Sequence, residues 1–171
     1  ALARLGAAPR VIASVGEDQF GTRYIAALSD AGADVARVAV ESDHPTGTAL
    51  IEVDSSGQNR IVIVSGANGC MNASTVRRRL ADIAHGDLVL FQLEIPLDSV
   101  WEAVREADDR GAVVVLDPAP AAEIPASVLP HISWITPNEH EAATITGVAT
   151  DTDEGLKDAA RALVDAGVQH A

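Results

Sequence analysis

The chain has 171 residues, 47% of them hydrophobic and 22% charged, so it can bury a sizeable core, and its length favours a single domain. Its formal net charge of −13 opposes binding to a nucleic acid backbone or an anionic membrane, which both require an excess of Lys and Arg. The single cysteine, Cys70, excludes an internal disulfide, no spacing suggests structural zinc, and no targeting or membrane-spanning segment is evident, which together favour a cytoplasmic setting.

Strand and helix patterns alternate along the chain, as is typical of βα units on a mostly parallel sheet. The predicted strands are 10–14, 88–92 and 113–116, and the predicted helices are 19–31, 97–110 and 153–166. Glycines at positions 32 and 167 follow two of these helices and suit helix ends. The pattern predicts an α/β fold with helices flanking the sheet.

One segment interrupts this alternation. Residues 48–53 and 60–64 are strand-like and are joined by the turn-forming residues 54–59. They predict an antiparallel hairpin inserted at about 35–65, with 35–40 as a candidate third strand. Appendages of this kind often cover a ligand cleft in α/β enzymes.

Strand alternation gives this hairpin a small, branched apolar face. Ala49, Ile51 and Val53 share one side of the first strand, and Ile61 and Ile63 share one side of the second. Two interpretations stay open, because such a face can pack on the domain or a second subunit, or can act as a lid over a ligand. The pattern alone favours packing.

Glu94 follows the apolar run 88–93 and therefore lies just past the carboxyl end of a predicted buried strand. Ligands of open α/β sheets bind at this edge. A carboxylate there can accept hydrogen bonds from two neighbouring sugar hydroxyls. Capping of the helix that begins near Leu97, or a simply solvated position, explains Glu94 equally well.

Residues 136–141 read TPNEHE, with Asn138 at a predicted helix start and Glu141 three residues later. On spacing alone a capping box is favoured, with the Asn at the N-cap and the Glu at the third helical position. The alternative is a site for phosphate and hydrated Mg²⁺, built from a helix N-terminus, an amide and a carboxylate.

Asp117 begins a DPAP turn directly after the strand 113–116, where a turn role is favoured over ligand contact.

Several familiar motifs are missing from the sequence. It has no GxGxxG, GxxxxGK[ST], GxSxG or HExxH, so dinucleotide folds, P-loop proteins, elbow hydrolases and zinc proteases have no support.

Taken in order, six short motifs resemble those of the family of ribokinase-like carbohydrate and nucleoside kinases. They are VGEDQFG at 15–21, TGTALI at 46–51, SGAN at 65–68, QLE at 92–94, DPAP at 117–120 and ITPNEHE at 135–141. The likeness covers essentially the whole chain and is greater to ribokinases than to fructokinases or adenosine kinases. One departure is Asp117, where ribokinases commonly have Asn.

The resemblance implies a ribokinase-like, Rossmann-type fold with a small antiparallel lid. It implies that Ala49, Ile51 and Ile63 are the apolar contacts of the lid with the sugar, and that Glu94 hydrogen-bonds the sugar hydroxyls. In such kinases the lid strands also pair two subunits, so a homodimer is expected.

For the nucleotide, the resemblance implies that Asn138 contacts the phosphates of ATP and that Glu141 helps to hold Mg²⁺ through water. The family's GAGD-like motif, which carries the catalytic base, is expected beyond Ala171, and the first strand is expected before Ala1. We therefore expect a partial domain, residues 1–171, that is inactive alone, because phosphoryl transfer depends on positioning and charge stabilisation. A site for an activating monovalent cation would also lie outside this sequence.

The predicted activity of the parent kinase is ATP-dependent phosphorylation of D-ribose to ribose 5-phosphate. Two alternatives remain at this point. The parent can be another sugar or nucleoside kinase of the family, such as a fructokinase or an adenosine kinase, or the chain can be a non-catalytic remnant that binds sugar or serves assembly.

Overall fold

A computed structural model describes residues 1–171 apart from the side chain of Asn59. The chain forms two compact units, Ala1–Asn72 and Ala73–Ala171, and each has its own strands and helices. None of the described helices is both long and apolar enough to cross a membrane.

The first unit contains a parallel strand pair and a long hairpin. Its elements are η1 (Ala3–Leu5), β1 (Arg10–Gly16), α1 (Gln19–Asp30), β2 (Asp34–Glu41), β3 (Thr48–Val53), β4 (Asn59–Val64) and η2 (Gly66–Cys70). The predicted strand 10–14 and helix 19–31 are thereby confirmed within two residues at each end.

The prediction that residues 35–40 add a third strand to the hairpin is wrong. Residues 35–40 belong to β2, which pairs in parallel with β1, from Ile12 opposite Arg37 to Gly16 opposite Glu41. Helix α1 connects these two strands, so the strand pattern of 35–40 is confirmed but its predicted partner is not. Choice of partner depends on residues distant in sequence, which a strand pattern does not report.

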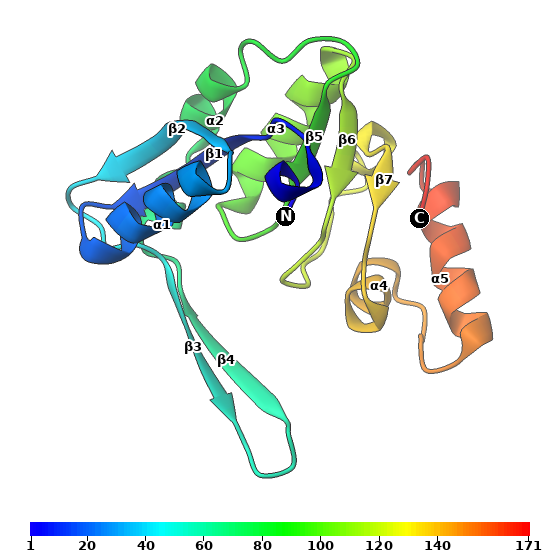
Figure 1. Ribbon diagram of the computed structural model, residues 1–171. Helices are drawn as coiled ribbons and strands as arrows, with labels where there is room; N and C mark the ends of the chain where they lie inside the picture. Colours follow the sequence, from blue (N-terminus) through cyan, green and yellow to red (C-terminus); the bar gives the residue numbers. More distant parts are fainter. The chain divides into compact units, whose positions relative to one another are not determined.

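Strands β3 and β4 form a two-stranded antiparallel ribbon that extends away from β1, β2 and α1 (Figure 1). Every residue of β3 is exposed. The turn between the strands is organised by Asp54, whose carboxylate accepts hydrogen bonds from the backbone and hydroxyl of Ser56 and from the Gln58 amide. These bonds lower the pKa of Asp54.

The second unit is built on a three-stranded parallel sheet in the order β5-β6-β7 (Figure 1). Its elements are α2 (Ala73–Arg79), β5 (Leu88–Phe91), α3 (Leu97–Asp109), β6 (Val113–Leu116), η3 (Leu129–His131), β7 (Trp134–Ile135), α4 (Glu139–Thr146) and α5 (Asp153–Asp165). The predicted α/β architecture is confirmed, and the strand 113–116 has the predicted bounds.

The core of this unit lies between the sheet and α3. Val114 and Leu116 on β6 are fully buried, as are Val100 and Val104, one turn apart on α3. The spacing of four residues puts the two α3 valines on one helical face, opposite the alternate residues of the strand. This packing fixes the sheet whose carboxyl edge carries the candidate site residues.

Candidate functional site

Three loops leave the carboxyl edge of the β5-β6-β7 sheet together. The backbone amide of Asp117 donates to the Phe91 carbonyl at 2.9 Å, and that of Thr136 donates to the Leu116 carbonyl at 3.0 Å. Because the strands are parallel, the segments after β5, β6 and β7 emerge at the same edge. Ligands of open α/β sheets bind at this edge.

Glu94 lies in the first of these loops, three residues after β5, and its side chain is exposed. The loop is tied down next to it, because the Leu93 amide donates to the Ala119 carbonyl at 2.9 Å and the Leu93 side chain is buried. Glu94 therefore presents an exposed carboxylate from a fixed backbone, which can accept hydrogen bonds from a hydroxylated ligand.

Asp117, in the second loop, has a partner in the first loop. The Gln92 side-chain amide donates to its carboxylate at 3.1 Å, which links the loops after β5 and β6. The turn role favoured from the sequence stays a prediction.

Asn138 and Glu141 form a capping box at the start of α4. The Asn138 side chain accepts from the Glu141 amide at 2.9 Å, and the Glu141 carboxylate accepts from the Asn138 amide at 2.8 Å. Asn138 is exposed, whereas Glu141 is only 7% exposed. The predicted capping box is thus confirmed. It holds both side chains at the N-terminus of the helix, where anions bind.

The ribbon register confirms the apolar face predicted from strand alternation. Ala49 lies opposite Ile63, and Ile51 opposite Ile61, so these side chains share one face. Ile51 is 59% exposed and Ile63 is 52% exposed. The first unit therefore carries an open apolar surface of the kind that meets a ligand or another chain.

The opposite face of the ribbon is apolar as well. Leu50 lies opposite Val62 and Thr48 opposite Val64, while Glu52 faces Arg60. Leu50 is 63% exposed, and both valines are also exposed. A ribbon with two exposed apolar faces can cover one ligand and contact one further surface at the same time.

A contact that sequence reasoning missed lies at the base of the ribbon. Asp18 caps α1 through the Gly21 amide at 2.8 Å, and it also accepts from the amide and the hydroxyl of Thr46, at 2.8 and 2.7 Å. These bonds, the Thr46 amide first, lower the pKa of Asp18 to about 2. An Asp before a helix signals an N-cap, but no local pattern indicates a partner 28 residues away.

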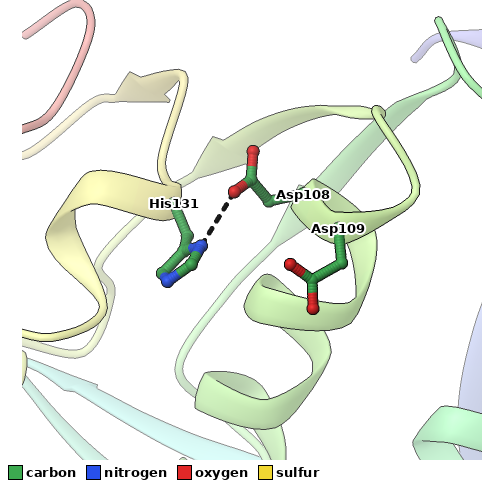
Figure 2. A group of neighbouring side chains, drawn as sticks. All are labelled: Asp108, Asp109 and His131. Atoms are coloured by element: carbon green, nitrogen blue, oxygen red, sulfur yellow. Dashed lines mark hydrogen bonds and ion pairs between the residues drawn. The ribbon is translucent and has the colours of Figure 1, made fainter.

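In the second unit, Asp108, Asp109 and His131 gather at the end of α3 (Figure 2). It is the one group of three potential metal ligands among the described side chains, with ligand atoms within 4.8 Å of one another. His131 Nδ1 lies 2.8 Å from an Asp108 oxygen, while Asp109 is exposed. We interpret this contact as a structural link between the last turn of α3 and η3.

Comparison with known proteins decides the family. The whole chain, residues 1–171, matches the sequence profile described as pfkB family carbohydrate kinase. The chain is a member of the pfkB family of carbohydrate kinases. The resemblance drawn from its six motifs is thereby confirmed.

Individual pfkB relatives agree with this assignment. Ribokinase of Haemophilus influenzae is 39% identical over 169 residues, which cover 99% of this chain and 55% of that protein. Deoxyribokinase of Salmonella typhi is 32% identical over 171 residues, which cover 99% of this chain and 56% of that protein. The chain therefore spans about half the length of the curated relatives that it matches.

Solved structures show that this pfkB chain has a ribokinase-like fold. Arabidopsis thaliana ribokinase, solved in complex with ribose and ATP, has a TM-score of 0.82 and is 31% identical. The match covers 97% of this chain and 55% of that one. The predicted fold class, with its parallel sheet and antiparallel ribbon, is confirmed.

Proposed function

We propose that this chain belongs to an ATP-dependent kinase that phosphorylates D-ribose to ribose 5-phosphate. The observation that carries the proposal is the exposed carboxylate of Glu94 on a fixed loop at the carboxyl edge of a parallel sheet, in a chain of the pfkB family. The proposed setting is the cytoplasm, supported by the single cysteine, Cys70, which is a free thiol.

In this proposal the described residues bind and orient the sugar. Glu94 accepts hydrogen bonds from sugar hydroxyls, and two bonds to one carboxylate fix orientation as well as position. Ala49, Ile51 and Ile63 supply an apolar surface that excludes water from a bound sugar. Proper orientation of the acceptor hydroxyl is a large part of phosphoryl-transfer catalysis.

The start of α4 fits a role toward ATP and Mg²⁺. The capping box already holds an amide and a nearly buried carboxylate at a helix N-terminus, and Mg²⁺ is bound by few carboxylates and several waters. We assign Asn138 to the nucleotide phosphates and Glu141 to hydrated Mg²⁺. When bound, the metal neutralises charge that develops on the transferred phosphoryl group.

The catalytic base is proposed to lie in another part of the whole kinase. The 171 residues contain no GAGD motif, and the Haemophilus influenzae ribokinase is nearly twice as long. We expect the chain alone to show no ATP-dependent phosphorylation of ribose in a coupled assay. Turnover by the chain alone would contradict this assignment of the base.

The direct test is substitution of Glu94 in the whole kinase that contains this sequence. Glu94→Gln keeps the size of the side chain but removes the charged acceptor, so the KM for ribose should rise by about tenfold or more while the KM for ATP changes little. Glu154→Gln is the matched control, since it changes an exposed carboxylate on α5. Equal KM values for ribose in both variants would remove Glu94 from the sugar site.

The same assay separates the alternatives in substrate. Deoxyribose, fructose and adenosine are compared with ribose by kcat/KM, the ratio that defines specificity. A higher value for one of them would assign the chain to a sister kinase. Absence of turnover with all four, by a whole protein that has no GAGD motif, would favour a non-catalytic remnant.

We further propose that the kinase is a homodimer joined through the second ribbon face, the one with Leu50, Val62 and Val64. Its support is that this face is apolar and exposed, while the face with Ile51 is assigned to the sugar. Light scattering of the whole kinase should give the mass of a dimer. The Leu50→Asp variant should give half of that mass, the mass of a monomer. Ser55→Asp, which puts the same charge in the ribbon turn, should leave the dimer intact, and a dimer that survives Leu50→Asp would contradict the proposal.

A further inference from the structure

The β3-β4 ribbon is held to the first unit at its base. Along its length the two strands form a sheet of their own, with no third strand beside them in the described sheets. The residues before β3 and after β4, by contrast, make short hydrogen bonds to β1, to the N-cap residue of α1 and to each other. The direction in which the ribbon leaves the unit is therefore decided at these residues.

The centre of this base is a carboxylate that holds one residue twice. One oxygen of Asp18 accepts from the Thr46 hydroxyl at 2.7 Å, and the other accepts from the Thr46 amide at 2.8 Å. The Thr46 hydroxyl in turn accepts from the Gly16 amide at 3.0 Å. Two contacts from the two oxygens of one planar group fix both the position and the rotation of Thr46, as bidentate contacts do elsewhere.

Backbone segments approach one another closely around Thr46. A Cβ on Gly16 would overlap the backbone of His44, Pro45 and Thr46, and a Cβ on Gly66 would overlap the Pro45 carbonyl. That carbonyl also accepts from the Ala67 amide at 2.8 Å. Both ends of the ribbon therefore meet at the Pro45–Thr46 segment, which Asp18 holds.

A small error at this point is amplified along the ribbon. Ile51 lies five residues beyond Thr46, about 16 Å along an extended strand, so a tilt of about 5° displaces Ile51 by about 1.4 Å. Misplacement by about 1 Å can cost up to about a hundredfold in rate when the displaced group positions a substrate. The contact at Thr46 is thus able to control what the ribbon does at its far positions.

We propose that Asp18 is a positioning residue that sets the angle of the ribbon by clamping Thr46, in addition to capping α1. The clamp itself involves only residues of the first unit. Its effect on catalysis rests on the proposed function, because it requires that Ile51 and Ile63 contact the sugar.

Two substitutions separate the clamp from the cap. Asn is as good an N-cap as Asp, so Asp18→Asn keeps an oxygen for the Gly21 amide but turns an NH₂ group toward the Thr46 amide, which then has no acceptor. Asp18→Ala removes both functions. Thr46→Ser keeps the hydroxyl and is the conservative control, whereas Thr46→Val removes it.

The first measurement is residue-resolved amide hydrogen exchange on this 171-residue chain. In Asp18→Asn the Thr46 amide should exchange about tenfold faster or more, while the Gly21 amide changes by less than about threefold. In Asp18→Ala both amides should exchange faster, and in Thr46→Ser neither. An unchanged Thr46 amide in Asp18→Asn, or equal acceleration of both amides, would overturn the clamp.

The second measurement uses the whole kinase and whichever sugar it phosphorylates. Asp18→Asn and Thr46→Val should raise the sugar KM by about tenfold, with the ATP KM within about twofold and with Thr46→Ser near wild type. A sugar KM unchanged in Asp18→Asn would overturn the positioning role. A sugar other than ribose would contradict the proposed function and leave the exchange result standing, so the two failures are distinguishable.

Discussion

Helices α1 and α4 both begin with a side-chain cap, but the two caps reach over very different distances. At α4, Asn138 and Glu141 each accept a hydrogen bond from the backbone amide of the other, within four consecutive residues. At α1, the Asp18 carboxylate accepts a hydrogen bond from the Gly21 amide and another from the amide of Thr46, which lies beyond β2. The α4 cap starts a helix, whereas the α1 cap also joins its helix to the ribbon, so loss of each should be felt in a different part of the chain.

The largest expected effect is that of Gly16→Ala, which disturbs the residues near Thr46, the distant partner of the α1 cap. A Cβ at position 16 would overlap backbone atoms of residues 44–46, which cannot move aside as a side chain can. Overpacking of this kind costs about 3 kcal/mol of unfolding free energy. Urea unfolding followed by circular dichroism, with hydrogen exchange to locate the loss in the first unit, measures it.

Gly69→Ala is the control for that substitution. Gly69 lies in η2, and nothing stands within 4 Å of the position that a Cβ would take there. The change should alter the unfolding free energy by no more than about 0.5 kcal/mol. If both glycine variants were equally stable, the base of the ribbon would be looser than its contacts indicate.

An intermediate effect is expected for Asn138→Ala, on the α4 side. It removes the N-cap acceptor of the Glu141 amide and should cost about 1 kcal/mol. Both tryptophans, Trp101 and Trp134, belong to the second unit, so urea unfolding followed by tryptophan fluorescence reports this loss directly. Exchange at Thr46 should stay at its wild-type rate, and acceleration there would break the distinction between a local and a long-range cap.

The smallest expected effect is the pH dependence of the stability that Asp18 contributes. It appears only in acid, and it sharpens the comparison of the two caps. Hydrogen bonds to Thr46 and Gly21 lower its pKa from 3.8 to about 2 in the folded chain. A depressed carboxyl pKa stabilises the fold above pH 3.8, and that contribution is lost as the pH falls toward 2. Asn138 has no titrating group and contributes no such dependence.

Unfolding of wild type and Asp18→Asn at several pH values measures this contribution. The difference in unfolding free energy between the two proteins should be constant from about pH 5 to 7 and should shrink between pH 3.8 and about 2. A difference that persists unchanged to about pH 2 would show that the charge of Asp18 is not what holds Thr46.

What could be predicted from the sequence follows the same division between local and distant contacts. The ribbon, the strand 113–116 and the capping box depend on residues near one another, and all three are predicted correctly. Helix α2 is missed because it is short and rich in Ser, Thr and Arg, and β7 because two residues carry no periodic signal. The partner of β2 and the Asp18–Thr46 contact depend on chain folding, which local patterns do not report.

The base of the ribbon also bears on how such a chain can diversify. Asp18, Thr46 and the backbone of Gly16, Pro45 and Ala67 hold it, and none of these residues belongs to β3 or β4. Mutations within the ribbon can therefore accumulate without loosening its attachment. We therefore expect that residues 48–64 can be replaced by the corresponding segment of a relative while the attachment and its orientation are kept.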